Sequence, residues 1–301
     1  MKILLIGHEG QVAWELQRTL ACLGVVVAVG RNTQPSLNLG QPDEIRATLR
    51  AIQPDLIVNA AAYTAVDRAE QDRVAAYAIN AEAVAVLAEE AKNRGAGLVH
   101  YSTDYVFPGN ATQPYQEEDT LGPLGVYGQS KLAGEAAIRD VGIPHLILRT
   151  AWVYGRRGQN FLLTMLRLMR ERDSLGIVND QHGAPTWSRL IAEASALMLS
   201  QCIHQGRFEP ANRSGTYHLT CAGETSWFGF ASQIRELALK QGLLDDTAAT
   251  LNPIPTSAYP TPAQRPAYSV LSNDKLASEF GIRLPDWQQA LKLCLEESIT
   301  R

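Results

Sequence analysis

The sequence has no long hydrophobic run and no strongly basic segment. None of its apolar stretches approaches the ~18–20 residues of a membrane-spanning helix, so no membrane span or membrane partner is expected. The net charge is −4 and no block of Lys and Arg stands out, which disfavours binding to nucleic acid. The sequence also has no internal repeat and no low-complexity region.

The pattern of metal-binding and disulfide-forming residues is equally sparse. The four cysteines lie far apart, at positions without metal-type spacing: Cys22, Cys202, Cys221 and Cys294. We expect free thiols in a reducing cytoplasm and therefore a cytoplasmic protein. The six histidines are scattered without a His-Glu-x-x-His pattern, so no catalytic metal is expected. The apolar run at 1–6 stops at Gly7, too short for a signal peptide, and predicts a first strand.

What the sequence does have is a regular alternation of short apolar runs and helical patterns. This alternation predicts an α/β fold, a Rossmann-type doubly wound parallel sheet with a smaller C-terminal substrate-binding lobe. We expect a dinucleotide-binding domain over 1–151, to which later elements return, and mainly the substrate-binding lobe over 152–301. The expected strands are 2–6, 25–29, 54–59, 97–101, 145–148 and 215–219. The expected helices are 11–23, 43–52, 74–94, 128–139, 160–172, 188–202, 227–241 and one from 284 onward, and 179–186 is expected to be a polar loop. Pro42 suits the first turn of its helix, and Asn160 is expected to cap the helix that it begins.

A glycine turn follows the first strand and leads into a helix. Gly7 and Gly10 precede Gln11 and Val12 at the start of the helical pattern. Glycines allow the backbone to approach a pyrophosphate closely, and a helix N-terminus favours its negative charge. The spacing is Gly-x-x-Gly-x-x-Ala rather than the common Gly-x-Gly-x-x-Gly, so a simple strand–helix turn is the alternative interpretation.

The end of the second strand bears on the choice of cofactor. An acidic residue there would bind the ribose 2′-hydroxyl of NAD, whereas the first charged residue here is Arg31, which suits a 2′-phosphate. We therefore expect NADP(H) to be preferred, with NAD(H) left open. The alternative is that Arg31 is a solvated surface residue. Asn38 and Leu39 are expected to pass over the adenine.

The stretch from Ser102 to Lys131 contains the candidate catalytic groups. Tyr127 and Lys131 are four residues apart at the start of a helical pattern, which places them on one helix face. A nearby ammonium lowers the pKa of a tyrosine from its usual ~10, and the hydroxyl of Thr103 can orient the same reacting oxygen. These groups suit general acid–base catalysis on a carbonyl and alcohol pair. A Tyr-x-x-x-Lys pair is common by chance, so a surface or core pair is the alternative.

Six segments together resemble the extended short-chain dehydrogenase/reductase family. They include Tyr127-Gly128-x-x-Lys131 and the run Ser102-Thr103-Asp104. The full set is 10–12, 59–67, 100–107, 127–135, 149–154 and 255–266. The resemblance covers nearly the whole chain, and several matching segments in the same order are unlike a chance similarity.

The resemblance implies reduction of the C4 ketone of dTDP-4-dehydro-6-deoxy-L-mannose to dTDP-L-rhamnose. By position, Tyr127 is the proton donor, Lys131 lowers the Tyr127 pKa and holds the nicotinamide ribose, and Thr103 is the third catalytic residue. The positions implied to bind the cofactor are Gly10, Gln11, Val12, Ala61, Ala62, Thr64, Tyr127 and Lys131. The positions implied to bind the dTDP-sugar are Thr103, Asp104, Tyr127, Trp152 and Arg265. Trp152 suits packing on a sugar face, and Arg265 is a candidate for the diphosphate, with a surface ion pair as its alternative.

Two departures from the family pattern affect these expectations. Asn38 stands where an acidic residue is common near the adenine, which removes a charge that would repel a 2′-phosphate. Some members form a magnesium-bridged dimer through three glutamates, but here only Glu15 is kept, and Arg189 and Gln288 occupy the other positions. Because magnesium prefers carboxylate oxygens, we expect no metal site of this kind and no homodimer bridged by magnesium.

Two other functions stay open from the sequence. One is a sugar-nucleotide epimerase or dehydratase of the same fold, although such a dehydratase often carries two acidic residues after the catalytic threonine, and here only Asp104 follows before Tyr105. The other is a non-catalytic regulatory subunit that binds NADP, since a fold alone does not determine activity. Intact Thr103, Tyr127 and Lys131 favour the enzyme.

Overall fold

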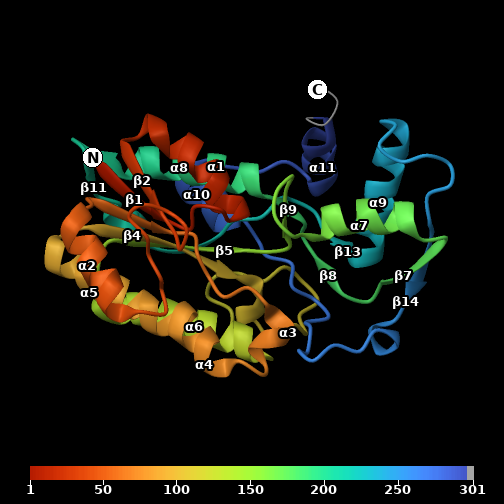
Figure 1. The fold of residues 1–301 in the computed structure, drawn as a ribbon, viewed down its shortest axis with the longest axis horizontal. Coiled ribbons are helices and arrows are strands. Elements are labelled where there is room, and N and C mark those ends of the chain that lie inside the picture. Colours follow the sequence, from red (N-terminus) through yellow and green to blue (C-terminus); the bar gives the residue numbers. More distant parts are fainter. Residues whose placement is uncertain (297–301) are drawn as a thin grey trace.

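A six-stranded parallel sheet forms the centre of the protein, in a computed structural model that describes residues 1–296 (Figure 1). The strand order is β12-β5-β4-β3-β1-β2, and every neighbouring pair is parallel. The strands are β1 (Lys2–Ile6), β2 (Val25–Val29), β3 (Leu56–Asn59), β4 (Gly97–Thr103), β5 (His145–Thr150) and β12 (Gly215–His218). The predicted doubly wound sheet is confirmed.

Helices cover both faces of this sheet, which explains why its strands are apolar along their whole length. All seven residues of β4 are buried. In Figure 1 one face lies against α2 (Pro42–Ile52), α5 (Ala83–Arg94) and α6 (Val126–Val141). The other face lies against α1 (Gln11–Thr19), α8 (Ser188–Cys202) and α10 (Asp274–Phe280). Two separate hydrophobic clusters result, one on each side of the sheet.

The direction of winding changes between β1 and β3, because the chain first moves outward to β2 and then returns to the other side of β1. Ligands of doubly wound sheets bind at such a switch point, beyond the carboxyl ends of the strands. Gly7 lies there with φ +109°, and a Cβ on it would come within 3.2 Å of the backbone of Ala60 and Ala61. Only glycine fits this turn without strain.

Local chemistry accounts for several helix ends. Pro42 occupies the first turn of α2, and Asn160 caps α7 (Phe161–Glu171) by accepting a hydrogen bond from the Leu163 N–H at 3.1 Å, both as predicted. The helix expected over 11–23 is shorter: α1 ends at Thr19, and a 3₁₀ turn, η1 (Leu20–Cys22), follows it.

The single helix expected over 74–94 is interrupted by a π-helical turn. The chain forms α4 (Arg73–Tyr77), the π-turn η2 (Ala78–Glu82) and then α5. Asn80 in the π-turn accepts from the Tyr63 N–H at 2.8 Å and donates to the Tyr63 carbonyl at 3.1 Å and to Ser130 Oγ at 3.0 Å. Gly134 on α6 packs directly on the Asn80 carbonyl. The turn therefore connects the loop after β3 to α6.

The second part of the molecule, on the right of Figure 1, is built around three helices and a strand pair. They are α7, α9 (Trp227–Lys240), α11 (Trp287–Glu296), and β7 (Ser174–Val178) paired with β14 (Thr250–Ile254). The polar loop expected over 179–186 contains β8 (His182–Gly183) and β9 (Thr186–Trp187). They pair with β13 (Thr225–Ser226) and β6 (Val153–Tyr154), respectively, so this prediction was incomplete.

The remaining elements of the chain are short. They are α3 (Val66–Ala69), η3 (Asp104–Val106), β10 (Ile203–His204), β11 (Arg207–Phe208), η4 (Ala211–Arg213) and η5 (Thr256–Ala258). The domain boundary at residue 151 stays a prediction; β12 comes from beyond it and lies in the central sheet. No helix within residues 1–296 has the length and apolar character needed to cross a membrane.

Candidate active site

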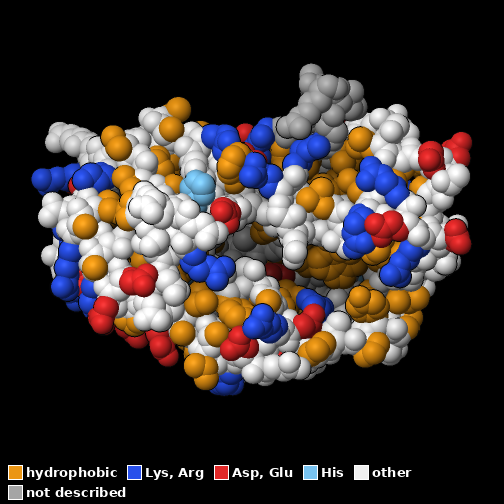
Figure 2. All heavy atoms as spheres, viewed as in Figure 1, with side chains coloured by type: hydrophobic (Ala, Val, Ile, Leu, Met, Phe, Trp, Pro, Cys, Tyr) orange, Lys and Arg blue, Asp and Glu red, His pale blue; other side chains and the backbone are white. Residues whose placement is uncertain are grey.

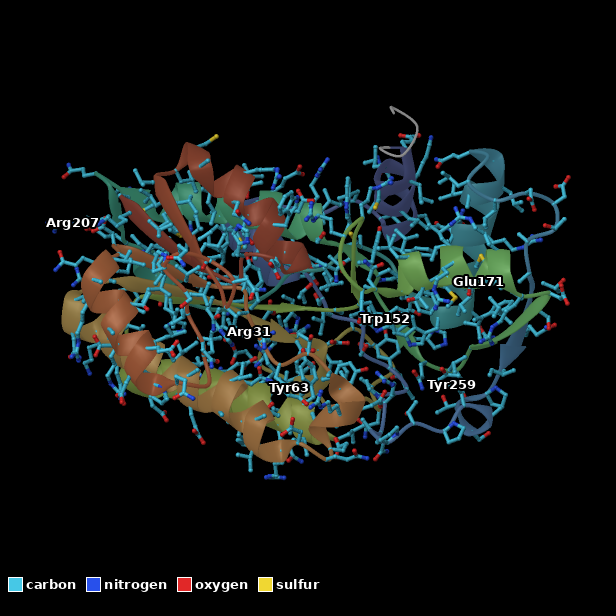
Figure 3. The ribbon with its side chains drawn as sticks, viewed as in Figure 1. Arg31, Tyr63, Trp152, Glu171, Arg207 and Tyr259 are labelled. Atoms are coloured by element: carbon cyan, nitrogen blue, oxygen red, sulfur yellow. The ribbon has the colours of Figure 1, made fainter. Side chains whose placement is uncertain are left out.

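The candidate site lies where the surface is hollowed between the sheet and the second part of the molecule (Figure 2). Figure 3 shows Arg31 and Tyr63 on the side of the sheet, and Trp152 and Tyr259 toward the second part. The carboxyl ends of β1, β3 and β4 lead toward this hollow, so the groups that follow these strands are gathered there.

The glycine turn presents the start of α1 to the site. Gly10 is the residue before α1, its backbone is extended, and no side chain caps the first turn of the helix. Gln17 Nε2 donates to the His8 carbonyl at 2.9 Å, and Gln11 Oε1 accepts from Asn160 Nδ2 at 2.9 Å. These contacts fix the turn from both sides. Uncapped N–H groups of Gln11 and Val12 at a helix start suit the oxygens of a pyrophosphate.

The residues expected near the adenosine differ in how they are exposed. Arg31 and Asn38 are exposed, and Asn38 Oδ1 accepts from the Gly40 N–H at 3.0 Å. The side chain of Leu39 is buried in the hydrophobic cluster beneath β1. Leu39 therefore has only its backbone to offer a cofactor.

Two asparagines hold the segment after β3. Asn59 Oδ1 accepts from the Ala61 N–H at 3.2 Å, and Asn80 binds both backbone groups of Tyr63. Ala61 and Ala62 are partly exposed and Thr64 is exposed. This segment has no regular secondary structure, yet its backbone is fixed by these hydrogen bonds.

Tyr127 and Thr103 come together at the end of β4. Tyr127 lies in the first turn of α6, and the side chain of Thr103 acts on its hydroxyl to lower the Tyr127 pKa. Burial raises the pKa of Tyr127 above its ordinary value, and Thr103 offsets this only in part. The phenol therefore keeps its proton at neutral pH, which is the form that a proton donor needs.

Lys131 follows one helical turn later but is directed at the sheet. Its Nζ donates to the Tyr101 carbonyl at 2.6 Å and lies 3.1 Å from Nε2 of His100. Burial lowers the pKa of Lys131 to about 8, while Glu135 acts in the opposite direction. Burial is the largest influence on the Tyr127 pKa in this structure, and the prediction that Lys131 lowers that pKa stays a prediction.

Asp104 supports Thr103 and leaves one oxygen without a partner. Thr103 Oγ1 donates to Asp104 Oδ1 at 2.9 Å and accepts from the Tyr105 N–H at 3.2 Å. Asp104 is only 2% exposed, and burial raises its pKa to about 6. Within the described chain, Asp104 Oδ2 is buried without a hydrogen bond. A buried carboxylate oxygen of this kind is suited to a hydroxyl group of a ligand.

Trp152 is fixed in an unusual position at the hollow. Its φ is +46°, and its ring stacks on Trp227 with centroids 3.5 Å apart and planes 5° apart. Gly183 passes so near that a Cβ there would come within 2.5 Å of the indole. Because Trp227 covers one face of Trp152, a sugar has only the uncovered part of the ring available.

Arg265 is held by protein groups rather than left free. Its Nη2 pairs with Asp67 Oδ2 at 2.8 Å, and its Nη1 donates to Tyr105 Oη at 3.0 Å. The ring of Tyr105 meets that of Tyr127 edge to face, with centroids 5.6 Å apart. The ion pair that the sequence left as the alternative for Arg265 is thus present, and a phosphate would have to compete with Asp67.

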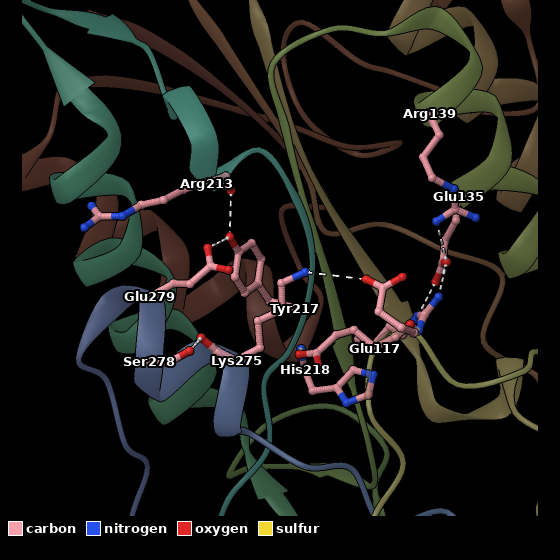
Figure 4. Close-up of polar contacts among 11 residues, drawn as sticks. Glu117, Glu135, Arg139, Arg213, Tyr217, His218, Lys275, Ser278 and Glu279 are labelled. Atoms are coloured by element: carbon pink, nitrogen blue, oxygen red, sulfur yellow. Dashed lines mark hydrogen bonds and ion pairs between the residues drawn. The ribbon is translucent and has the colours of Figure 1, made fainter.

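Sequence reasoning missed a buried ionic network beside the site (Figure 4). Arg149 on β5 donates from Nε and Nη2 to the two oxygens of Glu135 at 2.9 and 2.7 Å. Ser102 Oγ donates to the same carboxylate at 2.6 Å, and Glu117 Oε1 accepts from the His218 N–H at 2.8 Å. Charged residues within apolar patterns were the available signal, but their partners lie on separate elements and could not be paired from sequence.

The positions considered for a bridging metal form contacts within the chain. Arg189 Nε lies 3.4 Å from Glu15 Oε2, and Gln288 Nε2 donates to Gln233 Oε1 at 3.3 Å. Residues 1–296 contain no group of three or more side chains arranged to hold a metal ion. The expectation about a metal-bridged dimer stays a prediction.

The fold is that of a Rossmann-type enzyme of the extended short-chain dehydrogenase/reductase class. The glycine turn before α1, the hydroxyls of Thr103 and Tyr127 and the ammonium of Lys131 fit the same class. The family model described as the RmlD substrate binding domain matches residues 1–300. The chain is 49% identical over 302 residues to dTDP-4-dehydrorhamnose reductase of Burkholderia thailandensis, covering all of both chains. It is 46% identical to the enzyme of that name from Escherichia coli K12, covering 100% of this chain and 99% of the other. The chain therefore belongs to the dTDP-4-dehydrorhamnose reductase family.

Solved structures agree with this assignment. A dTDP-4-dehydrorhamnose reductase from Clostridium acetobutylicum has a TM-score of 0.89 at 35% identity, covering 99% of each chain. One from Bacillus anthracis, in complex with NADP, has a TM-score of 0.86 at 32% identity, covering 98% of this chain and 99% of that one. A UDP-glucose 4-epimerase from Thermus thermophilus, at 18% identity and a TM-score of 0.79, shares the fold.

Proposed function

We propose that the protein reduces the C4 ketone of dTDP-4-dehydro-6-deoxy-L-mannose to dTDP-L-rhamnose with NADPH. Family membership supports the substrate class. The observation that carries the proposal is the gathering of Thr103 at the carboxyl end of β4 with Tyr127 in the first turn of α6, and Lys131 one helical turn further on. An epimerase or dehydratase of this fold and a non-catalytic NADP-binding subunit are the alternatives.

The residues around the glycine turn fit NADP(H). The missing Cβ of Gly7 and the fixed backbone at Ala61 leave room for a dinucleotide, and the uncapped start of α1 after Gly10 offers N–H groups. Exposed Arg31 is suited to the 2′-phosphate, and the Bacillus anthracis relative was solved with NADP. When bound, NADPH supplies the hydride.

The protein's own groups supply the proton. Tyr127 keeps its proton because its pKa is raised, and it donates that proton to the C4 oxygen as negative charge develops there. Thr103 is held by Asp104 and by the Tyr105 N–H, so its hydroxyl is positioned beside the reacting oxygen. The ammonium of Lys131 stabilises the phenolate that remains.

The other groups at the hollow bind the substrate. Asp104 Oδ2 receives a sugar hydroxyl, the uncovered part of Trp152 packs on the sugar ring, and Arg265 leaves Asp67 to meet the diphosphate. We place the reaction in the cytoplasm. Any homodimer is expected to form without a magnesium bridge, since Arg189 pairs with Glu15.

The test follows the absorbance of the reduced cofactor when the protein is mixed with NADPH and the keto-sugar nucleotide. Steady consumption of NADPH with formation of dTDP-L-rhamnose is expected, and NADH should be consumed more slowly. Tight NADPH binding without consumption would instead identify the regulatory subunit. Conversion of the sugar without net consumption of NADPH would identify an epimerase or dehydratase.

A further inference from the structure

The side chain of Tyr105 lies between the candidate catalytic pair and Arg265, and the mechanism described above gives it no role. Tyr105 belongs to η3, the short turn that directly follows β4. Its backbone N–H donates to Thr103 Oγ1 at 3.2 Å. Its ring meets the ring of Tyr127 edge to face, with centroids 5.6 Å apart and planes at 76°. One residue therefore contacts both members of the catalytic pair, Thr103 through its backbone and Tyr127 through its ring.

The backbone of Tyr105 is fixed against the helix that carries Tyr127. Gly128 on α6 has no Cβ, and the Tyr105 carbonyl fills the space that a Cβ would need. The Phe107 N–H donates to the Asp104 carbonyl at 3.1 Å and closes the turn around Tyr105. The Tyr105 ring is thus held at a defined place beside the Tyr127 ring, and such edge-to-face pairs limit how far either ring can move.

The hydroxyl of Tyr105 is one of two anchors of the Arg265 guanidinium. Nη1 of Arg265 donates to Tyr105 Oη at 3.0 Å, and Nη2 donates to Asp67 Oδ2 at 2.8 Å. The side chain of Asp67 is 41% exposed, so water and salt weaken its ion pair. Tyr105 is only partly exposed. Of the two anchors, Asp67 is therefore the one that a charged ligand replaces at lower cost.

The chain on either side of Arg265 stays in place during such an exchange. Asp67 Oδ1 accepts from the Ala263 N–H at 3.2 Å, a contact that does not involve Arg265. Ala263 and Pro266 are buried, and Pro266 packs against Gly109, whose φ is +75°. A guanidinium carries its donors in a rigid planar fork. Moving Nη2 from Asp67 to another oxygen therefore requires only that the fork turn about the contact between Nη1 and Tyr105.

We propose that Tyr105 is a positioning residue with two functions. Its hydroxyl keeps hold of Nη1 of Arg265 while Nη2 passes from Asp67 to an oxygen of the substrate diphosphate, and its ring holds the phenol of Tyr127. This inference rests on the proposed function, which places the diphosphate at Arg265. The part of the substrate that does not react is then bound through the residue that supports the proton donor, which is how remote binding energy helps a reacting centre.

The first experiment measures thymidine diphosphate (dTDP) binding to Tyr105→Phe by calorimetry. This variant keeps the ring and the backbone N–H and removes only the hydroxyl that Arg265 contacts. The dissociation constant of dTDP should rise by roughly three- to tenfold, the usual effect of losing one hydrogen bond, and that of NADPH should stay unchanged. An unchanged affinity for dTDP would overturn the proposal.

The same substitution in an Arg265→Gln background tests whether the hydroxyl acts through Arg265. Arg265→Gln alone should weaken dTDP binding, and adding Tyr105→Phe should then change the affinity by less than about twofold, because the two groups act as one unit. Equal weakening by Tyr105→Phe in both backgrounds would show a merely structural role and overturn the proposal. An Arg265→Gln variant that binds dTDP as tightly as the unmodified protein would overturn it as well.

The second experiment separates the hydroxyl from the ring by steady-state kinetics with NADPH and the keto-sugar nucleotide. Tyr105→Phe should raise KM and leave kcat near normal, whereas Tyr105→Leu, which also removes the ring beside Tyr127, should lower kcat by a further three- to tenfold or so. Equal kcat values for the two variants would refute the function of the ring. Tyr105→Phe carries the test of the hydroxyl by itself, whether or not Tyr105→Leu folds.

Tyr217→Phe is the matched control, because it removes a tyrosine hydroxyl that contacts Glu279 and the Arg213 carbonyl on β12's side of the sheet (Figure 4). It should leave dTDP affinity and KM unchanged. The binding comparison involves no turnover, so its outcome is distinct from that of the proposed reduction. A protein that consumes NADPH as proposed, but whose Tyr105→Phe variant binds dTDP normally, would retain the proposed function and lose this role of Tyr105.

Discussion

At the scale of single residues, burial decides the chemistry of the candidate catalytic groups. Tyr127 and Lys131 are both shifted toward their uncharged forms, Tyr127 by a raised pKa and Lys131 by a pKa lowered to about 8. Lys131 therefore loses a proton more easily than it would in water, whereas Tyr127 holds its proton more firmly. The helix spacing brings the two residues together, but the sheet beneath them sets their protonation.

Tyr127→Phe should reduce kcat by roughly 10²–10⁴-fold, because it removes the proton donor without changing the ring that packs at the start of α6. NADPH affinity and thermal stability should change little. Steady-state kinetics and cofactor titration measure these effects. Tyr77→Phe, which alters a tyrosine of the same small aromatic cluster, serves as the control and should keep near-normal turnover. A Tyr127→Phe enzyme with normal kcat would remove Tyr127 from the mechanism.

Arg31→Ala should weaken NADPH binding by roughly ten- to a hundredfold, since a hydrogen bond to a charged group contributes about 1.5–3 kcal/mol. NADH binding should be almost unchanged, because NADH has no 2′-phosphate. The dissociation constants of both cofactors can be measured by fluorescence titration. Arg207, labelled far from the hollow in Figure 3, provides the control substitution Arg207→Ala. Equal weakening of NADPH and NADH would contradict the assignment of Arg31.

At the scale of elements, single side chains connect helices to the glycine turn. Asn160 caps α7 through its Oδ1, and its Nδ2 donates to Gln11 Oε1 at 2.9 Å and to the Gly155 carbonyl at 2.8 Å. One residue thus begins a helix in the second half of the chain and also supports the start of α1. Stability and cofactor binding are therefore coupled at this position.

Asn160→Ala should lower the free energy of unfolding by about 1 kcal/mol through loss of the cap, and should also weaken NADPH binding. Asn160→Asp is the matched variant, because a carboxylate keeps the acceptor for Leu163 N–H but cannot donate to Gln11. It should retain most of the stability while still weakening NADPH. Urea unfolding and cofactor titration separate the two effects. If Asn160→Ala and Asn160→Asp both bound NADPH as tightly as the unmodified protein, the hydrogen bond from Asn160 to Gln11 would not be needed for cofactor binding.

At the scale of the whole molecule, a buried ionic network ties the strands and α6 together. Glu135 and Arg149 are almost completely buried, and their pair is bidentate.

Glu135→Gln should lower the free energy of unfolding by about 3–5 kcal/mol, because it leaves the buried charge of Arg149 without its counterion. Glu171→Gln, which breaks the exposed pair with Arg167, is the control and should cost less than about 1 kcal/mol. Urea unfolding at pH 7 measures both, and equal losses would contradict the role assigned to burial.

The pH dependence of stability should also report on the whole fold. Burial lowers the pKa of His218 to about 3, with Arg149 as a second cause. The unfolded chain binds a proton at His218 below its ordinary pKa of ~6.5, whereas the folded chain does not. The stability contributed by neutral His218 is therefore complete above pH ~6.5 and is lost as the pH falls toward 3, at about 1.4 kcal/mol per pH unit.

His218→Asn should flatten this acid slope by about one proton in urea unfolding measured between neutral and mildly acidic pH. His204→Asn is the control, because His204 is exposed. Buried His100, whose pKa is also lowered, should keep part of the slope in both variants. An unchanged slope in His218→Asn would mean that His218 is not kept neutral by the fold.

The sequence by itself determined the class of sheet, most of its strands, the cap at Asn160, the place of Pro42 in the first turn of α2, and the segments that carry Thr103, Tyr127 and Lys131. These features follow from local patterns: apolar runs for covered strands, helix spacing for the tyrosine and lysine, and short polar side chains at helix starts. The motif order also indicated the family that the relatives support.

Only the tertiary structure decided what these groups face. The partners of His100, Glu135 and Arg265 lie on other elements, with sequence separations of 41, 14 and 198 residues from Asn59, Arg149 and Asp67. The π-turn at Asn80 depends on Tyr63 and Ser130, which also lie outside its helix. Desolvation and hydrogen bonding depend on which atoms surround a group, and that neighbourhood arises only when the strands assemble. For this reason the sequence located the candidate catalytic residues, whereas the folded sheet set their protonation.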